Sequence, residues 1–207
     1  MEAAATRARP RALSSEKARR IVEAMRESVG EVGIAGSTFE RVSRKAGVSR
    51  GLLHYYFGSK ERLLVAVIRR DTEIRIEELG ADLEASESVD ELIGAFFGMF
   101  QRTLAEGTGY VYMVSELFVA GRHSPELARE LGELYRTARE AFSAILERKE
   151  SEGVIRMRFG ADAVLAYLFA AGDGAAVQML SDPGYDVDAS AGIAYGVAHY
   201  LLCGDGA

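Results

Sequence analysis

Apolar residues recur at three- and four-residue spacing along most of the chain, and no segment shows the strict alternation of a half-buried strand. This pattern predicts an all-α protein. The first helical stripe consists of Ala18, Ile21, Val22, Met25 and Val29. Because glycine favours helix C-termini, we expect this first helix to end near Gly30 and Gly33.

A second, short helix is predicted by the capping box at residues 37–40, where a serine is followed three residues later by a glutamate. In such a box the side chains of Ser37 and Glu40 each satisfy a backbone N–H that the helix leaves unpaired. The apolar face of this helix consists of Phe39, Val42 and Ala46. Gly47 ends the helix, and Val48 is expected to be buried beside it.

A third helix is predicted over residues 50–57, with Ser49 as its cap and Gly58 at its end. Ser59 then caps a fourth helix. Two short helices around an Ala-Gly-Val turn have the layout of a helix-turn-helix, in which the second helix lies in the major groove of DNA. Gly51 lowers the helix propensity by about 1 kcal/mol relative to alanine. Either close approach to DNA or a packing need would explain this glycine.

The net charge of −6 is divided unevenly along the chain. Residues 1–70 hold 15 Lys or Arg against 7 Asp or Glu, a net of +8, whereas residues 71–207 hold 10 against 24, a net of −14. Since phosphate contacts supply much of the affinity for DNA, the first third of the chain is suited to a nucleic acid. A solvated basic end without a partner is the alternative. Three arginines lie near the N-terminus: Arg7, Arg9 and Arg11. They either follow the minor groove as an arm or form a disordered end. We favour the disordered end.

Residues 38–57 and the Ser-Lys-Glu-Arg-Leu-Leu segment at 59–64 resemble the DNA-binding segment of the TetR family of regulators. The family's most recognisable positions are matched, in order and spacing, by Val48, Ser49, Tyr56, Phe57, Ser59, Lys60 and Glu61. The detailed resemblance covers residues 15–75, and the rest of the chain agrees in length and helical pattern.

The chain departs from this family at four positions. His54 stands where tyrosine is usual, and Tyr55 stands where histidine is frequent. Leu52 replaces a common threonine, and Val29 replaces an aromatic residue. The first three departures bear on which operator sequence is read, whereas the last affects only the shape of the core.

The resemblance implies two kinds of DNA contact. The residues that would face bases or their sugar-phosphate edges are Arg50, Gly51, His54 and Tyr55. The residues that would contact phosphates are Thr38, Arg44, Ser49, Tyr56 and Lys60. Arg50 is able to read a guanine bidentately or to bridge to a phosphate, and both readings stay open. His54 flanks the core in an alternative reading, although its offset from Leu52 favours exposure.

The apolar stripes continue to the end of the chain. Further helices are expected at residues 63–83, from a capping box at 88–91 onward, at 110–119, from Ser124 to Gly153, at 162–180 and at 189–202. With the resemblance, these elements imply a three-helix helix-turn-helix DNA-binding domain at residues 15–75, with its recognition motif at 38–57. A helical-bundle ligand-binding and dimerisation domain would follow at residues 76–207.

The resemblance implies a small-molecule sensor and a dimer interface in the second domain. The candidate pocket residues are Phe96, Phe100, Tyr110, Met113, Glu116, Tyr167 and Asp173. Glu116 and Asp173 are acids inside apolar runs and would favour a cationic or hydroxylated ligand if both faced inward. The candidate dimer residues, from the two helices that form a four-helix interface in the family, are Leu165, Phe169, Val177, Ile193, Val197, Tyr200 and Leu201. For each of these residues an ordinary core position is the alternative.

Several features favour a soluble, cytoplasmic protein that does not enter a membrane. The longest uninterrupted apolar stretch, residues 164–171, is shorter than the ~20 residues that span a bilayer. No apolar signal-peptide core follows the N-terminal arginines. The single cysteine, Cys203, has no partner for an internal disulfide, which suits a reducing compartment.

No enzyme signature is present: the sequence lacks a Gly-x-Ser-x-Gly elbow, a phosphate-binding Gly-rich loop and a His-Glu-x-x-His pair. The three histidines are too scattered to hold one metal ion, so we expect neither metal nor cofactor. The expected function is a homodimeric repressor that a small molecule releases from a palindromic double-stranded operator. The alternatives are an architectural DNA-binding scaffold without an effector and, least favoured, a small-molecule enzyme.

Overall fold

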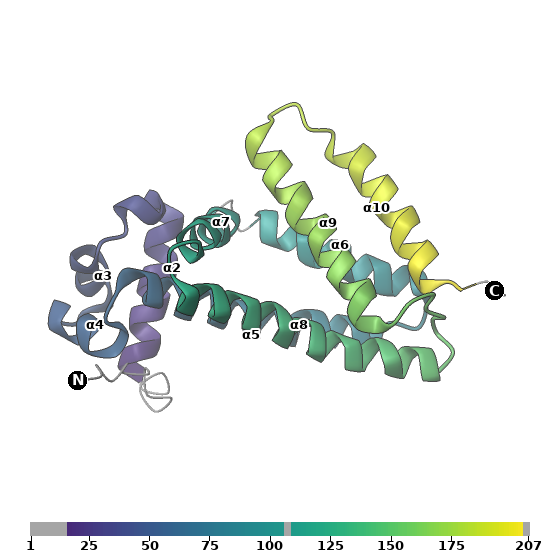
Figure 1. The fold of residues 1–207 in the computed structure, drawn as a ribbon, viewed down its shortest axis with the longest axis horizontal. Coiled ribbons are helices and arrows are strands. Elements are labelled where there is room, and N and C mark those ends of the chain that lie inside the picture. Colours follow the sequence, from purple (N-terminus) through teal and green to yellow (C-terminus); the bar gives the residue numbers. More distant parts are fainter. Residues whose placement is uncertain (1–15, 106–108, 205–207) are drawn as a thin grey trace. The chain divides into compact units, whose positions relative to one another are not determined.

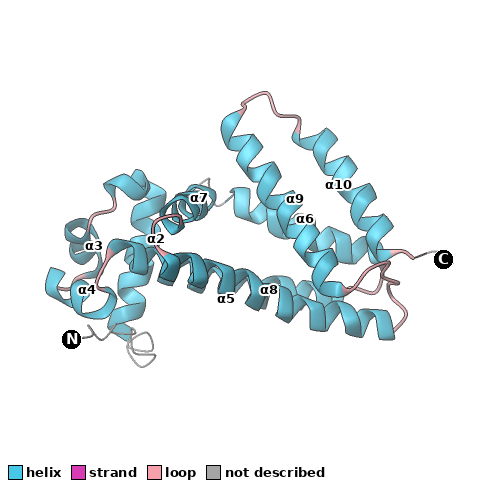
Figure 2. Cartoon of the chain, viewed as in Figure 1, coloured by secondary structure: helices cyan, strands magenta, loops and turns pink. Residues whose placement is uncertain are grey.

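The computed structural model describes residues 16–105 and 109–204, and within these ranges it contains nine α-helices and no strand (Figures 1 and 2). The helices are α2 (Glu16–Gly36), α3 (Phe39–Ala46), α4 (Arg50–Phe57), α5 (Lys60–Ala85), α6 (Val89–Ala105), α7 (Gly109–Gly121), α8 (Pro125–Ser151), α9 (Ala161–Ser181) and α10 (Val187–Leu202). The all-α prediction is confirmed. Arg7, Arg9 and Arg11 lie outside the described residues.

The described residues form two compact units. The first unit contains residues 16–71 and 112–131, and the second contains residues 72–105, 109–111 and 132–204. Helices α5, α7 and α8 therefore each contribute residues to both units.

Helix α2 packs its predicted apolar stripe into the core of the first unit. The buried residues of that stripe are Ala18, Ile21, Val22, Met25 and Val29. The backbone leaves the helical conformation at Gly33, where φ is 70° and ψ is 176°. Glycine adopts a positive φ at no steric cost, so Gly33 ends the regular helix as predicted.

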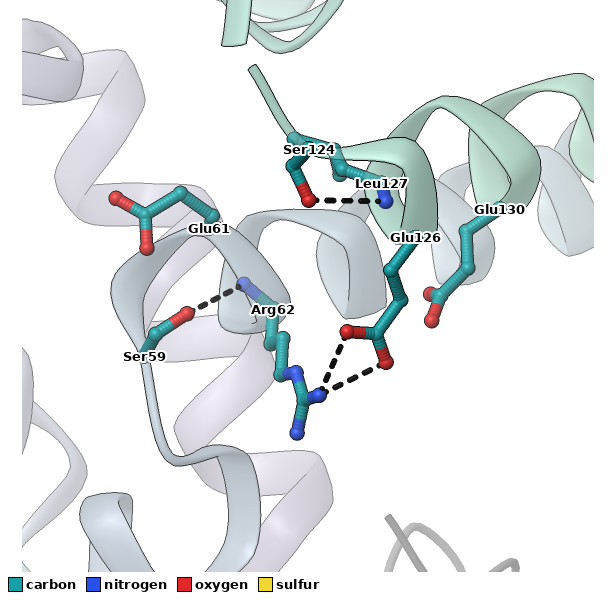
Figure 3. Close-up of a pocket in the computed structure, with 7 residues that line it drawn as sticks. All are labelled: Ser59, Glu61, Arg62, Ser124, Glu126, Leu127 and Glu130. Carbon is teal, nitrogen blue, oxygen red and sulfur yellow. Dashed lines mark hydrogen bonds and ion pairs between the residues drawn. The ribbon is translucent and has the colours of Figure 1, made fainter. Parts of the chain in front are cut away.

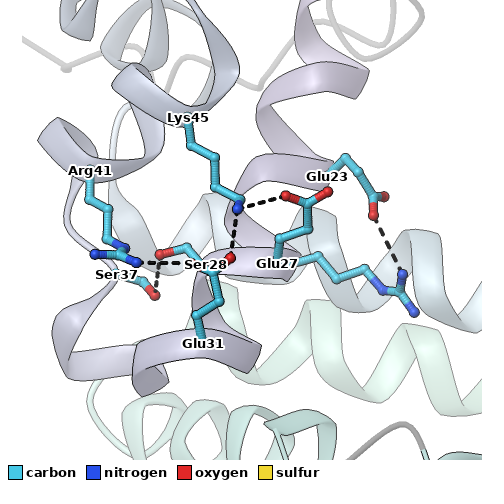
Figure 4. Close-up of polar contacts among 8 residues, drawn as sticks. Glu23, Glu27, Ser28, Glu31, Ser37, Arg41 and Lys45 are labelled. Atoms are coloured by element: carbon cyan, nitrogen blue, oxygen red, sulfur yellow. Dashed lines mark hydrogen bonds and ion pairs between the residues drawn. The ribbon is translucent and has the colours of Figure 1, made fainter.

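The cap of α3 is Thr38 rather than Ser37, so the predicted capping box is wrong. Thr38 Oγ1 accepts a hydrogen bond from the backbone N–H of Arg41 at 3.2 Å. Ser37 is fully buried; its hydroxyl donates to the Gly33 carbonyl at 2.8 Å and lies 2.9 Å from the Ser28 hydroxyl (Figure 4). A hydroxyl has one proton, so Ser28 is the donor in the second bond. Ser37 is thus committed to the kink of α2 and does not cap α3.

The turn between α3 and α4 is shaped by Gly47, whose φ of 64° lies in the left-handed region. The next N–H, of Val48, bonds back to the carbonyl of Ser43 at 3.0 Å, as in a glycine-based helix C-cap. From α2, the Arg20 guanidinium donates to the carbonyl of Ala46 at 2.9 Å. Val48 is half-buried and not buried as predicted, since it lies in the turn between α3 and α4 and not within a helix that packs on the core.

The core of the second unit is built from α5, α6, α8, α9 and α10, with α10 packed beside α6 and α9 (Figure 1). Its fully buried side chains include Leu79, Leu83, Leu92, Ile93, Leu146, Leu165 and Leu202. The predicted cap of α6 is present, since Ser88 Oγ accepts the N–H of Glu91 at 3.2 Å. These local caps set where the long helices begin.

Helix α9 is largely uncovered. Among the described residues it is the one helix that is long and apolar enough to cross a membrane by length and composition, and 17% of that stretch is buried. Asp173 interrupts the apolar run of α9, so α9 does not contain an uninterrupted apolar stretch long enough to span a bilayer. Val177 on α9 and Ile193 on the neighbouring α10 are both exposed. The two helices therefore present apolar surface that the chain itself does not cover.

Candidate functional site

Helix α4 brings together the side chains expected to face DNA bases. Its buried residues Leu53 and Phe57 anchor it to the first unit. The exposed residues on its other side are Arg50, Gly51, His54 and Tyr55. Offsets of one and four residues place these four positions on one face of a helix. The first unit thus presents an open polar and aromatic face of the kind that enters a major groove.

Gly51 is not required by packing within the chain. A Cβ atom at this position would have Ser49 Oγ as its nearest neighbour, at 4.0 Å, which is ordinary van der Waals contact. Gly51 is also absent from the glycines with positive φ. Of the two explanations of this residue, a packing need is therefore removed. Close approach to DNA stays a prediction for this residue.

Aromatic contacts order the middle of the α4 face. The His54 ring packs edge-on against Phe39, with ring centroids 4.8 Å apart, and its Nδ1 lies 3.3 Å from the carbonyl of Gly58. A carbonyl accepts hydrogen bonds, so Nδ1 carries a proton in this contact and Nε2 is left for another partner. Tyr55 is 77% exposed and meets the half-buried Tyr56 edge to face at 5.3 Å.

Three of the expected phosphate contacts are exposed side chains with spare hydrogen-bonding capacity. Thr38 Oγ1 accepts one bond as the cap of α3 and keeps its own proton to donate. Arg44 pairs with the equally exposed Glu40 at 3.6 Å, an i,i+4 contact worth about 0.3–0.5 kcal/mol. Ser49 caps α4 by position, but its side chain makes no capping hydrogen bond.

Lys60 has a structural partner that the sequence did not indicate. Its ammonium group donates to the backbone carbonyl of Ile34, near the end of α2, and is partly buried there. An ammonium group has three N–H donors, so this bond leaves donors for a phosphate. Lys60 ties the start of α5 to α2 and is not a freely extended cation.

An ion-pair network joins α2 to α3 (Figure 4). Lys45 Nζ lies 2.9 Å from Glu27 and 2.8 Å from Glu31, and Arg41 lies 2.8 Å from Glu31. Hydrogen bonds lower the pKa of Glu31, with the bond from Lys45 contributing most and the bond from Arg41 next. The pKa of Lys45 is raised, mainly by its hydrogen bond to Glu27. The network is complete at neutral pH and is lost as the pH falls through the lowered pKa of Glu31. Glu27 and Glu31 are four residues apart in α2, and Arg41 and Lys45 are four residues apart in α3, so each like-charged pair lies on one face of its helix.

The first unit also contains a pocket of about 310 Å³ lined by Ser59, Glu61, Arg62, Ser124, Glu126, Leu127 and Glu130 (Figure 3). Arg62 donates to both carboxylate oxygens of Glu126, at 2.8 and 2.9 Å. Ligand cavities are mostly apolar, whereas Leu127 is the one apolar residue of this lining. The pocket is a charged junction between α5 and α8, and none of the predicted ligand residues lines it.

The predicted ligand residues are divided between the two units. Met113 is buried and Glu116 is exposed, and both belong to the first unit. The second unit holds Phe96, Phe100, Tyr110, Tyr167 and Asp173, of which Phe96, Phe100 and Tyr110 are half-buried and Tyr167 is exposed. A cation site shared by Glu116 and Asp173 would need both side chains to face inward. Glu116 faces solvent, so the two acids do not form such a site.

Asp173 instead pairs with a tyrosine of α8 that the sequence did not mark as a site residue. The hydroxyl of Tyr135 donates to Asp173 Oδ2 at 2.7 Å. Desolvation raises the pKa of Asp173, and the hydrogen bond from Tyr135 opposes this rise. Desolvation, followed by the charge of Asp173, raises the pKa of Tyr135 well above its usual range. Tyr135 therefore remains the proton donor at neutral pH.

Family models match both parts of the chain. The model described as "Bacterial regulatory proteins, tetR family" matches residues 21–67, which contain the α3–α4 turn. The model described as "Tetracyclin repressor-like, C-terminal domain" matches residues 87–201, more than half of the chain. The chain belongs to the TetR family.

Curated TetR-family relatives are similar over part of the chain. The regulator BetI of Stenotrophomonas maltophilia is 30% identical over 112 residues, which cover 53% of this chain and 56% of BetI. The regulator UidR of Escherichia coli is 25% identical over 136 residues, which cover 66% of this chain and 67% of UidR. The chain thus spans little more than half the length of the first of these relatives.

Solved structures show the same fold over nearly the whole chain. GusR of Salmonella enterica has a TM-score of 0.69 at 22% identity and covers 92% of this chain and 98% of its own. A regulator from Saccharomonospora viridis in complex with choline has a TM-score of 0.70 at 19% identity, covering 89% of this chain and 96% of its own. At these identities the likeness shows the TetR fold.

The residues expected at a TetR-type dimer interface differ in exposure. Leu165 is fully buried in the chain's own core. Phe169 and Leu201 are half-buried and pack against that core, and Val197 is half-buried. The residues that remain exposed are Val177, Ile193 and Tyr200. Phe159 and Tyr195, which sequence analysis did not select, add exposed aromatic surface.

Proposed function

We propose that this TetR-family protein is a cytoplasmic, ligand-responsive repressor. It acts as a homodimer, binds a palindromic double-stranded operator through α4, and releases the operator when a small molecule binds the second unit. The observation that carries this proposal is the open α4 face, on which Arg50, His54 and Tyr55 surround a glycine that the chain's packing does not require. Such a face suits direct reading of base edges.

Substitutions of two exposed arginines test this reading. Arg50→Ala is expected to change the preferred base at one operator position, because a bidentate arginine contributes about 1–3 kcal/mol of discrimination. Arg44→Ala is expected to weaken binding to all sequences alike and to reduce the salt dependence by about one counterion per subunit, because it removes a phosphate contact. Sequence selection from a random duplex library, followed by anisotropy titrations at several salt concentrations, measures both effects.

Arg136→Ala is the matched control, because Arg136 is an exposed arginine of the second unit. It should leave both the preferred sequence and the salt dependence unchanged. Identical preferences and salt slopes for all three variants would overturn the assignment of α4. Binding at many dispersed genomic sites, and not at a few promoter palindromes, would favour an architectural role.

The uncovered apolar surface of α9 and α10 supports the homodimer. A single short helix makes few base contacts, so pairing two reading heads on a palindrome raises both affinity and specificity. The length and composition of α9 would also suit a bilayer. For a DNA-binding protein, covering of the apolar surface of α9 and α10 by a second copy of the chain fits better. Membrane association of the purified protein would count against this assignment.

Ile193→Asp is expected to convert the dimer to a monomer. Ile193 is 70% exposed on α10, and burying an unpaired carboxylate there costs about 3 kcal/mol or more, which raises the dissociation constant on the order of 100-fold. Val119→Asp is the matched control, because Val119 is 63% exposed on α7. Sedimentation velocity at micromolar protein measures both. A wild-type monomer, or an unchanged dimer in Ile193→Asp, would contradict the proposed interface.

Ligand responsiveness is supported by structural neighbours that hold ligands. One is a FadR from Bacillus subtilis in complex with stearoyl-CoA, with a TM-score of 0.68 at 18% identity, covering 89% of this chain and 98% of its own. Its ligand differs chemically from the choline of the Saccharomonospora neighbour. The fold therefore accommodates unrelated ligands, and the ligand class of this chain has to come from its own residues.

A further inference from the structure

Asp173 is an acid in the interior of the apolar helix α9, between two glycines. Glycine is unfavourable in the interior of a helix, so two glycines on either side of one residue call for an explanation. A Cβ atom at Gly172 would meet one atom within 4 Å, Phe100 Cδ2 at 4.0 Å, and a Cβ at Gly174 would meet none. The chain's own packing does not require either glycine. They keep side-chain atoms away from the two positions that flank the acid.

The carboxylate of Asp173 lacks a counter-ion among the described residues. The hydroxyl of Tyr135 is the hydrogen-bond donor that reaches it, and no Lys or Arg of the described residues forms an ion pair with it. The other acid of α9, Asp162, is paired with Arg139 at 2.7 Å. A tyrosine hydroxyl satisfies one lone pair of a carboxylate but leaves its charge uncompensated. Asp173 is exposed, and an exposed carboxylate without a counter-ion attracts a cation.

Tyr135 continues into a chain of aromatic contacts from α6, α8 and α9, which we call the aromatic cluster: Phe96, Tyr135, Phe142 and Phe169. Tyr135 and Phe142 each meet Phe169 edge to face, with centroids 6.4 and 6.1 Å apart. Phe96 meets Phe142 in the same way at 6.4 Å. Phe142 is buried in the core, whereas Phe96, Tyr135 and Phe169 are half-buried. The half-buried rings have π-faces that are partly open, and π-faces attract cations.

An aromatic face in the same unit already holds a cation. The guanidinium of Arg75 lies 4.5 Å above the ring of Tyr110, and Arg75 also donates to the hydroxyl of Thr103. Tyr110 is close enough to Tyr135 to influence its pKa. This contact shows that aromatic rings of the second unit compensate a positive charge. Arg75 is also the kind of positively charged group that a carboxylate ligand would need. Binding of an anion therefore has to be measured beside binding of a cation.

We propose that Asp173 and the aromatic cluster bind an organic cation, with Asp173 as the counter-ion and the rings enclosing the apolar groups around the positive charge. The regulatory meaning of this site rests on the proposed function, because binding there would be the event that releases the operator. Quaternary or tertiary ammonium compounds fit this chemistry. A ligand carboxylate next to Asp173 would be repelled.

Three compounds of matched shape distinguish the ligand classes. They are phenyltrimethylammonium, its neutral isostere tert-butylbenzene and the anion 4-tert-butylbenzoate. Calorimetric titration of the full-length protein should give a dissociation constant for the cation at least tenfold below those of the other two. No binding of the cation, equal binding of the three or preference for the anion would overturn the proposal.

Asp173→Asn tests the role of the carboxylate. The substitution keeps the shape and removes the charge, so cation binding should weaken at least tenfold while binding of the neutral compound stays the same. Asp162→Asn, on the same helix, is the matched control and should leave cation binding unchanged. Asp173→Asn should not lower the melting temperature, which separates loss of binding from loss of fold. Unchanged cation binding in Asp173→Asn would also overturn the proposal.

Operator binding is measured on the same samples. If the protein selects a palindrome but ignores the cation, the cation site is wrong and the repressor proposal stands. If the cation binds through Asp173 but no DNA sequence is selected, the repressor proposal fails and the cation site stands.

Discussion

Replacing Gly51 by alanine is expected to weaken operator binding by about 10- to 100-fold while making the protein more stable. Alanine in a helix is favoured over glycine by about 0.5–1 kcal/mol, and a Cβ here meets no atom of the chain closer than 4.0 Å. In the complex with DNA, the added methyl group would hold α4 away from the base edges. Each good contact with a base edge contributes about 1–3 kcal/mol of binding free energy. Thermal unfolding and anisotropy titration measure the two effects.

Gly94→Ala is the matched control for this prediction. Gly94 is an exposed glycine inside α6, and a Cβ there would also meet nothing within 4 Å. It should gain similar stability without any change in operator binding. If Gly51→Ala bound the operator as tightly as the unsubstituted protein, close approach of DNA at this position would be refuted.

Replacing Lys149 by methionine is expected to lower the free energy of unfolding by about 3 kcal/mol. Lys149 is 6% exposed, and its ammonium group donates to the carbonyl of Glu84 at 2.6 Å and to the carbonyl of Ser86 at 2.9 Å. These carbonyls lie where α5 ends, and methionine would leave them buried without a donor. Urea denaturation at fixed protein concentration measures the change.

The adjacent Arg148 provides the control for this substitution. Arg148 forms an ion pair with Glu84, but both side chains are nearly half exposed. Arg148→Met should therefore change the stability by less than about 1 kcal/mol. Equal effects of the two substitutions would show that the buried carbonyls near the end of α5 do not depend on Lys149.

The features predicted correctly from the sequence are those set by neighbouring residues. The caps at Ser59, Ser88 and Ser124 depend on an N–H group three residues away, and each is present at 3.2–3.3 Å. The family resemblance and the apolar stripes likewise placed the exposed α4 face correctly. These features needed no knowledge of which helices meet in space.

The features that were missed depend on partners far away in the chain. Ser37 is the local exception: it does not cap α3 because its hydroxyl donates to the carbonyl of Gly33, four residues away, and meets Ser28, nine residues away. The hydrogen bond between Tyr135 and Asp173 was missed because the two residues are 38 positions apart. The partners of Lys149 are more than 60 residues away, and no local pattern marks them.

The uncovered surface of α9 also has a genetic consequence. A Gly51→Ala chain retains all of this apolar surface, so in a cell that makes both versions it would pair with unsubstituted chains. Such mixed pairs would hold a single competent reading head and would grip the palindrome poorly. The altered allele should therefore be dominant over the wild type, whereas an Ile193→Asp allele, whose product cannot pair, should be recessive. A reporter strain carrying both alleles would reveal the difference.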